Sequence, residues 1–344
     1  MKNNKIVLAS RPVGEPKLSD FRSEASDAPE PKEGQVLLRT LFLSLDPYMR
    51  GRMSDAKSYA KPVDVGDVME GGTVSEVVAS NHPVFAEHDI VLGYSGWQEY
   101  ALSDGTNLRK LDTSSVAPTT ALGVLGMPGM TAYTGLLTIG QPKPGETVCV
   151  AAATGAVGSL VGQIAKIKGA RAVGIAGGPE KCKALIDEFG FDAAVDHRSL
   201  RFAEELAQAC PKGIDVYFEN VGGEVWRAVL PLLNDFARIP VCGLIAHYNA
   251  THLPTGPDRT PELMMKILRQ RLTLRGFIVS DFADQALEFY RDMSKWMKEG
   301  KIKYREDIVD GLDAAPEAFI GLLAGKNFGK LIVHVGDTTN GSKS

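Results

Sequence analysis

Small residues gather at one point of the chain in a spacing that suits a phosphate group. The segment AAATGAVG at residues 151–158 follows an apolar run at residues 147–151 and precedes an amphipathic segment at residues 159–169. This order predicts a strand, a tight turn and a helix. Glycine leaves room for a diphosphate to approach the backbone N–H groups at the start of a helix, where partial positive charge gathers. The residues predicted to bind a dinucleotide here are Thr154, Gly155, Ala156, Val157 and Gly158.

The turn departs from the full G-x-G-x-x-G pattern, because Ala153 stands where the first glycine would be. Two glycines three residues apart also serve as packing or capping residues in α/β proteins, so the short motif leaves both roles open. The context favours cofactor binding, since a second apolar run at residues 170–176 completes the length of a βαβ unit.

The residues after the second apolar run indicate which dinucleotide is bound. A site for NAD usually carries Asp or Glu about 20 residues beyond the glycines, where it binds the ribose hydroxyls and would repel a 2′-phosphate. The segment AGG at residues 176–178 occupies that position. Lys181 lies in the first turn of the next predicted helix, and His197 and Arg198 follow a predicted strand at residues 193–195. Lys181 also fits a solvated helix position, but the missing acid and the three cations together favour NADPH, with Gly178 beside its phosphate.

The composition is that of a globular enzyme and gives no support to nucleic-acid or membrane binding. Apolar residues make up 44% of the 344 residues and charged residues 23%, with a net charge of −4 and no basic block. No run of about 18 apolar residues and no secretory signal is found, so we expect a cytoplasmic enzyme. The four cysteines and six histidines show no metal-ligand spacing, so we expect no metal.

Two kinds of pattern divide the chain into domains. Short β-type runs at residues 6–9, 35–45, 69–78, 90–94 and 98–101 predict a β-rich, barrel-like domain. From residue 126 strands and helices alternate, which predicts a parallel sheet. Its later strands are expected at residues 215–218, 237–242 and 273–279, with helices at 261–271 and 284–299. A last apolar strand at residues 330–335 is expected to return to the first domain.

Five segments carry a resemblance to a known family. They are LDPYMR at residues 45–50, GMPGMTAY at 126–133, AATGAVG at 152–158, ENVGG at 219–223 and GKNFGK at 325–330. Together they resemble the zinc-free prostaglandin/leukotriene reductase branch of the medium-chain dehydrogenases/reductases. The resemblance implies an α/β protein with a GroES-like substrate domain at residues 1–127 and 308–344 and a Rossmann-type, doubly wound NADPH-binding domain at residues 128–307. It also implies reduction of the carbon–carbon double bond of α,β-unsaturated ketones or aldehydes.

The chain lacks the elements with which zinc-dependent relatives bind their metal. Those relatives carry Gly-His-Glu where this chain has Glu-Gly-Gly at residues 70–72, and a zinc-ligating cysteine in the region of Asp-Pro-Tyr at residues 46–48. The resemblance therefore argues against Lewis-acid catalysis, in agreement with the spacing of the cysteines and histidines.

Two tyrosines are candidates for the chemical step. Tyr248 follows the predicted strand at residues 237–242, at the end of a strand where open α/β sheets bind ligands. Its phenol could donate a hydrogen bond to the enolate oxygen that forms when hydride reaches an enone, or it could merely cover the nicotinamide ribose. Tyr48 lies on the segment that resembles the family's substrate-lining element.

Further residues complete the predicted site. Tyr59 and Trp97 are expected to form, with Tyr48, an aromatic pocket for a small, apolar, conjugated carbonyl substrate. Arg50 and Arg52 could clamp a substrate carboxylate or the cofactor diphosphate, or form structural ion pairs, and the structural role is favoured. The positions that match the family's nicotinamide and ribose site are Asn220, Cys242, Phe277, Ile278, Val279 and Asn327.

Two other functions and one assembly remain open. A quinone or alkenal reductase of the same fold would differ only in the shape of its pocket, and a non-catalytic NADPH-binding sensor would show no turnover with an enone. The strand at residues 273–279 has no obvious crossover helix after it. The resemblance suggests that such edge strands pair across a two-fold axis, so we expect a homodimer.

Overall fold

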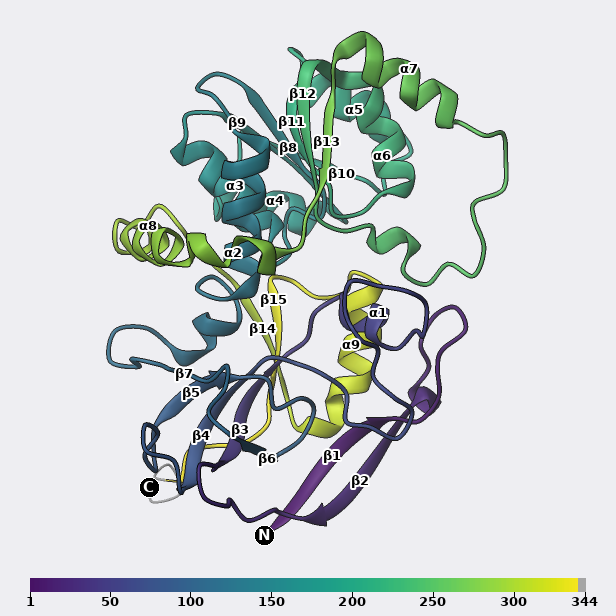
Figure 1. The fold of residues 1–344 in the computed structure, drawn as a ribbon. Helices are drawn as coiled ribbons and strands as arrows, with labels where there is room; N and C mark the ends of the chain where they lie inside the picture. The colour runs from purple at the N-terminus through teal and green to yellow at the C-terminus, as the bar shows by residue number, and fades with distance from the viewer. Residues whose placement is uncertain (340–344) are drawn as a thin grey trace. The chain divides into compact units, whose positions relative to one another are not determined.

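The computed structural model describes residues 1–339, and the chain divides into two compact units (Figure 1). The first unit consists of Met1–Gly123 and the segment that begins at Glu306, and the second is Val124–Arg305. None of the helices in residues 1–339 combines the length and apolar character needed to span a bilayer.

The first unit is built on a largely antiparallel sheet. In the described part of the chain this sheet has seven strands in the order β14-β15-β3-β4-β5-β7, with β6 paired to β3. Only β14 and β15 run parallel to each other. The strands are β3 (Val36–Ser44), β4 (Thr73–Ser80), β5 (Ile90–Gly93), β6 (Tyr100–Ser103), β7 (Arg109–Lys110), β14 (Glu306–Asp310) and β15 (Lys330–His334).

Two short strands and two helices complete the first unit. β1 (Lys2–Leu8) and β2 (Phe21–Asp27) form a separate antiparallel pair, while α1 (Met49–Arg52) follows β3 and α9 (Ala315–Leu323) precedes β15. The core of the unit contains Trp97, which is fully buried and stacks on Phe21 with ring centroids 5.6 Å apart. Phe319 of α9 meets the same indole edge-on at 5.8 Å. This aromatic cluster joins the C-terminal helix to the N-terminal strands.

The second unit contains a parallel sheet of the doubly wound type. Its order is β10-β9-β8-β11-β12-β13, and every neighbouring pair is parallel. Successive strands run outward from β8 on one side and from β11 on the other, so the order reverses between these two, where such folds bind ligands. The strands are β8 (Thr147–Val150), β9 (Arg171–Ala176), β10 (Ala193–Asp196), β11 (Ile214–Phe218), β12 (Leu233–Val241) and β13 (Thr273–Gly276). The predicted α/β fold is therefore confirmed.

Helices connect the strands of this sheet, while α2 precedes its first strand and α8 follows its last (Figure 1). The helix predicted at residues 284–299 is α8, whose Phe289, Met293 and Trp296 are buried in the core, whereas Leu287 is exposed. The helices are α2 (Met127–Thr134), α3 (Gly158–Ile167), α4 (Pro179–Asp187), α5 (Phe202–Ala209), α6 (Gly223–Val229), α7 (Thr260–Gln270) and α8 (Ala286–Lys298).

One strand is shorter than predicted. β13 ends at Gly276 instead of residue 279, and a 3-10 segment starts at Val279. The ring of Phe277 lies edge-on to Phe218 at 6.2 Å and to Phe282 at 6.1 Å. Phe282 belongs to the 3-10 segment Val279–Gln285. For its ring to pack on Phe277, the chain has to turn after β13, and this contact therefore favours a turn over a longer strand.

Candidate active site

The turn between β8 and α3 presents free N–H groups where the sequence predicts a diphosphate. Within residues 1–339, the backbone N–H groups of Ala156, Val157 and Gly158 have no acceptor, whereas that of Gly155 donates to the carbonyl oxygen of Ala152 at 3.0 Å. They lie at the N-terminus of a ten-residue helix, whose dipole favours an anion. The turn therefore fits the diphosphate of a dinucleotide.

Close packing explains the small residues of this turn. A Cβ on Gly158 would lie 2.8 Å from the Cα of Ala153, which is closer than real side chains approach. Ala153 replaces the first glycine of the fuller motif, and its methyl group would lie 2.9 Å from a Cβ on Gly174 in β9. The glycine at residue 174 therefore provides the space that the alanine occupies.

The three predicted cations lie around the ends of β9 and β10. A Cβ on Gly177 would be 2.9 Å from Nε2 of His197 and 3.0 Å from Nε of Arg198. Lys181 is in the first turn of α4. Burial, the charge of Arg198 and the charge of Lys181 lower the pKa of His197. The structure thus brings these three side chains to the loop that contains Gly178.

A carboxylate that the sequence analysis overlooked holds this loop. Oδ1 of Asp196, the last residue of β10, accepts hydrogen bonds from the N–H groups of Gly178 and Arg198, both at 2.9 Å. Burial alone would raise the pKa of Asp196, but these hydrogen bonds and the neighbouring cations lower it overall. The signal for this residue in the sequence is its position directly before His197 and Arg198, rather than after the apolar run at residues 170–176.

A second overlooked carboxylate organises the loop after β11. Glu219 is 3% exposed, and its Oε1 accepts hydrogen bonds from the N–H groups of Val221 at 2.7 Å and Gly222 at 2.8 Å. Burial raises the pKa of this carboxyl. The side-chain amide of Asn220 donates to the carbonyl oxygen of Ala151 at 2.8 Å. The loop after β11 is thus tied to the phosphate turn at the point where the strand order reverses.

Tyr248 lies beside that loop. It follows a 3-10 segment, Ile245–His247, after β12. A Cβ on Gly243 would be 2.9 Å from the Tyr248 hydroxyl oxygen and 3.6 Å from the carbonyl oxygen of Asn220. Within the second unit, the structure therefore brings Tyr248 close to Asn220, as a shared ribose and nicotinamide site requires.

The other predicted cofactor residues of the second unit are mainly packing or backbone positions. The N–H of Cys242 donates to the carbonyl oxygen of Glu219 at 2.9 Å. Burial raises the pKa of the Cys242 thiol to about 12, so the thiol stays protonated and unreactive. Phe277 packs on its aromatic neighbours, while Ile278 is extended and Val279 begins the next segment.

The first unit brings two of the predicted aromatic residues together through Arg52. The guanidinium carbon of Arg52 lies 5.4 Å from the ring centroid of Tyr48 and 4.8 Å from that of Tyr59. Burial and the charge of Asp46 raise the pKa of Tyr48, so its phenol stays protonated. Arg50 is buried and donates to the carbonyl oxygen of Gly14 at 2.9 Å.

Two predicted site residues have local structural contacts. Trp97 has no exposed surface and belongs to the aromatic core of the first unit, so its ring is not available to a ligand there. Asn327, also in the first unit, donates from Nδ2 to the carbonyl oxygen of Gly329 at 2.8 Å in the turn before β15.

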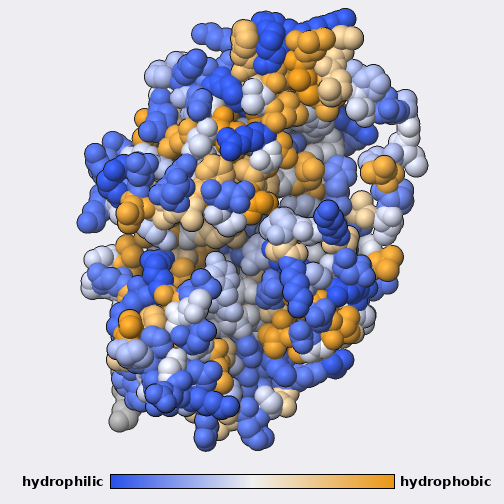
Figure 2. Space-filling model, viewed as in Figure 1, coloured by the Kyte–Doolittle hydropathy of each residue, from blue (hydrophilic) through white to orange (hydrophobic). Residues whose placement is uncertain are grey.

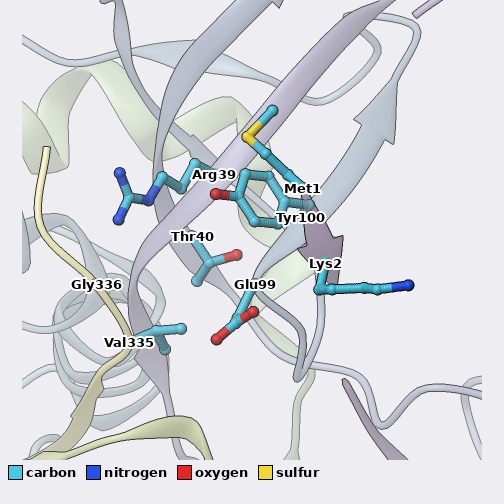
Figure 3. A pocket seen from close by; sticks show the side chains of 8 residues that line it. All are labelled: Met1, Lys2, Arg39, Thr40, Glu99, Tyr100, Val335 and Gly336. Atoms are coloured by element: carbon cyan, nitrogen blue, oxygen red, sulfur yellow. The ribbon is translucent and has the colours of Figure 1, made fainter. Parts of the chain in front are cut away.

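A separate cavity of about 230 Å³ lies in the first unit (Figure 3). It opens at the point of β3 where one hydrogen-bonding partner gives way to another. The N–H of Thr40 donates to the carbonyl oxygen of Glu99, whereas the carbonyl oxygen of Leu41 accepts from the N–H of Val335. The Thr40 hydroxyl is buried without a partner among the described residues. None of the predicted site residues lines this cavity, whose walls are Met1, Lys2, Arg39, Thr40, Glu99, Tyr100, Val335 and Gly336.

Possible metal ligands are scattered. Among residues 1–339, no three or more His, Cys, Asp or Glu side chains are grouped so that they could hold a metal ion. Glu70, at a position where zinc-dependent relatives have their metal-binding element, instead pairs with Nε of Arg52 at 3.2 Å.

The chain matches two known sequence families and closely resembles characterised reductases. Residues 4–111 match a family described as the N-terminal domain of oxidoreductase, and residues 156–299 match one described as zinc-binding dehydrogenase. An NADPH-dependent curcumin reductase of Escherichia coli (strain K12) is 61% identical over 335 residues, which cover 97% of each chain. Prostaglandin reductase 1 of Bos taurus is 44% identical over 328 residues, covering 93% of this chain and 95% of that protein.

Solved structures agree with this relationship. CurA from Vibrio vulnificus in complex with NADPH has a TM-score of 0.95 and 58% identity, covering 97% of this chain and 100% of that chain. The chain therefore belongs to the medium-chain dehydrogenase/reductase family, in the zinc-independent branch that includes the prostaglandin reductases. The resemblance to bacterial NADPH-dependent curcumin/dihydrocurcumin reductase, also visible in the sequence, is confirmed. A quinone oxidoreductase from Pseudomonas syringae, at 22% identity and a TM-score of 0.72, shares the fold alone.

Proposed function

We propose that this protein uses NADPH to reduce the carbon–carbon double bond of α,β-unsaturated ketones and aldehydes, curcumin-type enones among them. The observation that carries the proposal is the combination, in one unit, of a helix N-terminus with free N–H groups and a cluster of Lys181, His197 and Arg198. The first feature suits a diphosphate and the second a 2′-phosphate. The names of the E. coli and Vibrio relatives point to the same cofactor.

The roles of the two domains follow from this assignment. The domain at residues 128–307 binds NADPH, and residues 1–127 with 308–344 form the substrate domain. Asn220 and Tyr248 hold the nicotinamide ribose, with Cys242 and residues 277–279 of the same unit beside it. The family resemblance assigns Asn327, in the first unit, to the cofactor as well. The Asp196 and Glu219 carboxylates do not touch the cofactor in this assignment, because their oxygens hold the loops that do.

Tyr248 supports the chemical step as a hydrogen-bond donor. When bound, NADPH supplies the hydride that reaches the β-carbon of the enone. Negative charge then develops on the carbonyl oxygen of the substrate, and a phenol O–H fixed beside that oxygen stabilises the enolate. Gly243 leaves the space that the Tyr248 hydroxyl occupies. Tyr48, whose phenol stays protonated, is the second candidate donor and, with Tyr59, supplies aromatic surface for the substrate.

Isotope labelling tests this reaction. An enone is reduced with NADPH that carries deuterium at the transferred position, and in a second experiment with ordinary NADPH in deuterated water. We expect cofactor deuterium on the β-carbon and solvent deuterium on the α-carbon. Deuterium from the cofactor on the carbonyl carbon would mean carbonyl reduction. Tight NADPH binding without turnover of any enone or quinone would instead favour a sensor.

The proposal includes a homodimer formed through β13. This strand is the edge of the six-stranded sheet, where its outer N–H and C=O groups can pair with a second copy. Hydrophobic residues also gather where α7 meets β13, at the top of Figure 2. On α7, Met264 is 58% exposed and Leu268 71% exposed. A cytoplasmic location is likewise part of the proposal and is tested by cell fractionation.

A further inference from the structure

His197 is the one member of the cluster of Lys181, His197 and Arg198 whose charge can change near neutral pH. Its imidazole lies against the loop that contains Gly178, since a Cβ on Gly177 would be 2.9 Å from Nε2 of His197. The backbone N–H of His197 donates to the carbonyl oxygen of Ala176 at 3.0 Å, which ties the residue to the end of β9. Among residues 1–339, neither ring nitrogen has a hydrogen-bond partner. The ring is therefore anchored through its backbone and available to a ligand.

Three charged neighbours determine the charge of this ring. Partial burial and the charges of Arg198 and Lys181 lower the pKa of His197, whereas the charge of Asp196 opposes them. Oδ1 of Asp196 accepts hydrogen bonds from the N–H groups of Gly178 and Arg198, so this carboxylate serves the backbone of the two loops. Because the pKa of His197 is lowered from its ordinary value of about 6.5, the imidazole is mostly uncharged at neutral pH before a ligand binds.

Two further titratable side chains come from the helices that pack against β10. Burial raises the pKa of the Cys182 thiol in α4 to about 11, so this thiol stays uncharged. Glu205 of α5 accepts a hydrogen bond from Oγ of Ser199 at 2.9 Å. The charges that act on the ring are therefore two cations against one carboxylate, and this net positive charge is one that an anion would offset.

We infer that His197 takes up a proton from the solvent when the 2′-phosphate of NADPH binds, so that the affinity for NADPH, but not for NADH, rises as the pH falls. A 2′-phosphate carries nearly two negative charges at neutral pH. These charges stabilise the imidazolium and offset its repulsion by Arg198 and Lys181. NADH has no 2′-phosphate and leaves the charge of the ring unchanged. The inference rests on the 2′-phosphate site proposed above and adds the regulation of that site by pH.

The direction of the pH effect follows from linkage between proton binding and ligand binding. A bound phosphate raises the pKa of His197 above its value in the protein without ligand, and between these two pKa values NADPH binds together with a proton. The dissociation constant of NADPH should therefore increase roughly 3- to 10-fold per pH unit around pH 7 and level off at higher pH. The 2′-phosphate itself takes up a proton near pH 6, so the useful range begins at about pH 6.5.

Two variants of His197 isolate the effect of its proton. His197→Gln keeps a hydrogen-bond donor that cannot become charged, whereas His197→Arg carries a permanent positive charge. Fluorescence titration measures the dissociation constants of NADPH and NADH at about pH 6.5 and pH 8. We expect the Gln variant to bind NADPH weakly and the Arg variant to bind it tightly, each with less than about a twofold difference between the two pH values. The dissociation constant of NADH should depend little on pH in all three proteins.

Proton NMR follows the ring directly and does not depend on catalysis. The chain has six histidines, and the imidazole C–H signal that is missing from the His197 variants identifies this ring. We expect NADP⁺ to raise the pKa of His197 by roughly 0.5–1 and NAD⁺ to leave it unchanged. His334→Gln is the matched control, because His334 lies in the first unit and its Nδ1 pairs with Asp310 at 3.0 Å. This variant should keep the pH dependence of the wild type.

The outcomes distinguish this inference from the proposed function. Wild-type protein that does not bind NADPH would contradict the NADPH-dependent function and, with it, the inference. Tight NADPH binding with the same pH dependence in the wild type and in His197→Gln would overturn the inference alone. An equal pH dependence for NADPH and NADH, or a pKa of His197 that NADP⁺ does not raise, would overturn it as well. The NMR titration of the wild type needs only one folded His197 variant for assignment, so the test stays decisive if the other fails to fold.

Discussion

Tyr248 can place its hydroxyl beside Asn220 only because residue 243 has no side chain. A methyl group there would stand 2.9 Å from the hydroxyl oxygen. The space left at Gly243 thus lies next to both the donor and the loop that carries Asn220, and a small shift in either would change the distance to a substrate oxygen. Since hydrogen bonds to a developing oxyanion depend on placement, the reaction should respond strongly to this one phenol.

Tyr248→Phe is expected to lower kcat and kcat/KM together by about 10- to 1000-fold, because the lost hydrogen bond matters chiefly where charge develops. Steady-state kinetics with an enone measures the rates. Fluorescence titration should show that NADPH binds the variant as tightly as the wild type. An unchanged rate would leave Tyr248 as a cover for the ribose and make Tyr48 or water the proton source.

Lys181→Ala is expected to raise the KM for NADPH with little change in kcat, a loss of roughly 1–3 kcal/mol of uniform binding. The physical reason is the loss of one cation from the cluster around the predicted 2′-phosphate. Lys183→Ala on the same helix is the control, since Lys183 is exposed and pairs with Asp187. Equal use of NADH and NADPH by the wild type would contradict the assignment.

At the scale of elements, the strand, turn and helix around residues 147–167 could be predicted because the period of apolar residues changes within a short distance. The fit between Ala153 and Gly174 could not be predicted, since it joins the turn after β8 to the interior of β9. The sequence did not predict β2 and β14, because both segments, FRSEASD and EDIVD, are rich in polar residues and have several exposed positions. These segments are strands because they pair with β1 and β15, not because of an alternation of apolar and polar residues in their own sequences.

The loss of stability caused by replacing a glycine of the phosphate turn should be larger where an added Cβ would lie closer to its neighbours. Gly158→Ala is expected to destabilise the protein by about 1–3 kcal/mol and to weaken NADPH binding, because its methyl group would overlap the backbone of Ala152 and Ala153. Gly155→Ala should cost less, since its methyl group would lie 3.2 Å from the carbonyl oxygen of Ala152. Thermal unfolding and NADPH titration measure both variants. Equal effects at the two positions would mean that packing is not the cause.

The candidate site shows the same limit of sequence reasoning. The sequence could predict Asn220, Lys181, His197 and Arg198, because they lie next to glycines or at the ends of helices and strands. Local sequence pattern and family resemblance identify such positions. Asp196 and Glu219 were missed because their role depends on which backbone N–H groups the fold brings to them. Trp97 was expected at the substrate pocket, yet the packing of Phe21 and Phe319 around it makes it a core residue.

At the scale of the whole molecule, the surface around β13 and α7 is the place to test assembly. Light scattering at micromolar concentration is expected to give about twice the chain mass of 37.0 kDa. Leu268→Glu would place a charge among the exposed apolar residues of α7 and is expected to shift the protein toward the monomer. A wild-type mass near that of one chain would contradict the proposed dimer.

The protein is expected to work without a metal. Prolonged treatment with a chelator, followed by dialysis, should leave the rate of enone reduction unchanged, because no usual set of nitrogen and sulfur ligands occurs in the sequence. Zinc added to the treated protein should have no effect. Loss of activity that zinc restores would contradict this expectation.

The pairing of β15 with β3 also determines when the first unit can be completed during synthesis. β3 receives Ile332 opposite Ser44, and the buried ammonium of Lys330 reaches Asp46 at 2.9 Å, only after the ribosome has made all of Val124–Arg305. The second unit is continuous in the chain and can fold as soon as it emerges. The unit that begins first is therefore finished last, and until then the Phe42–Ser44 part of β3, which β6 does not cover, stays open to pairing with other chains.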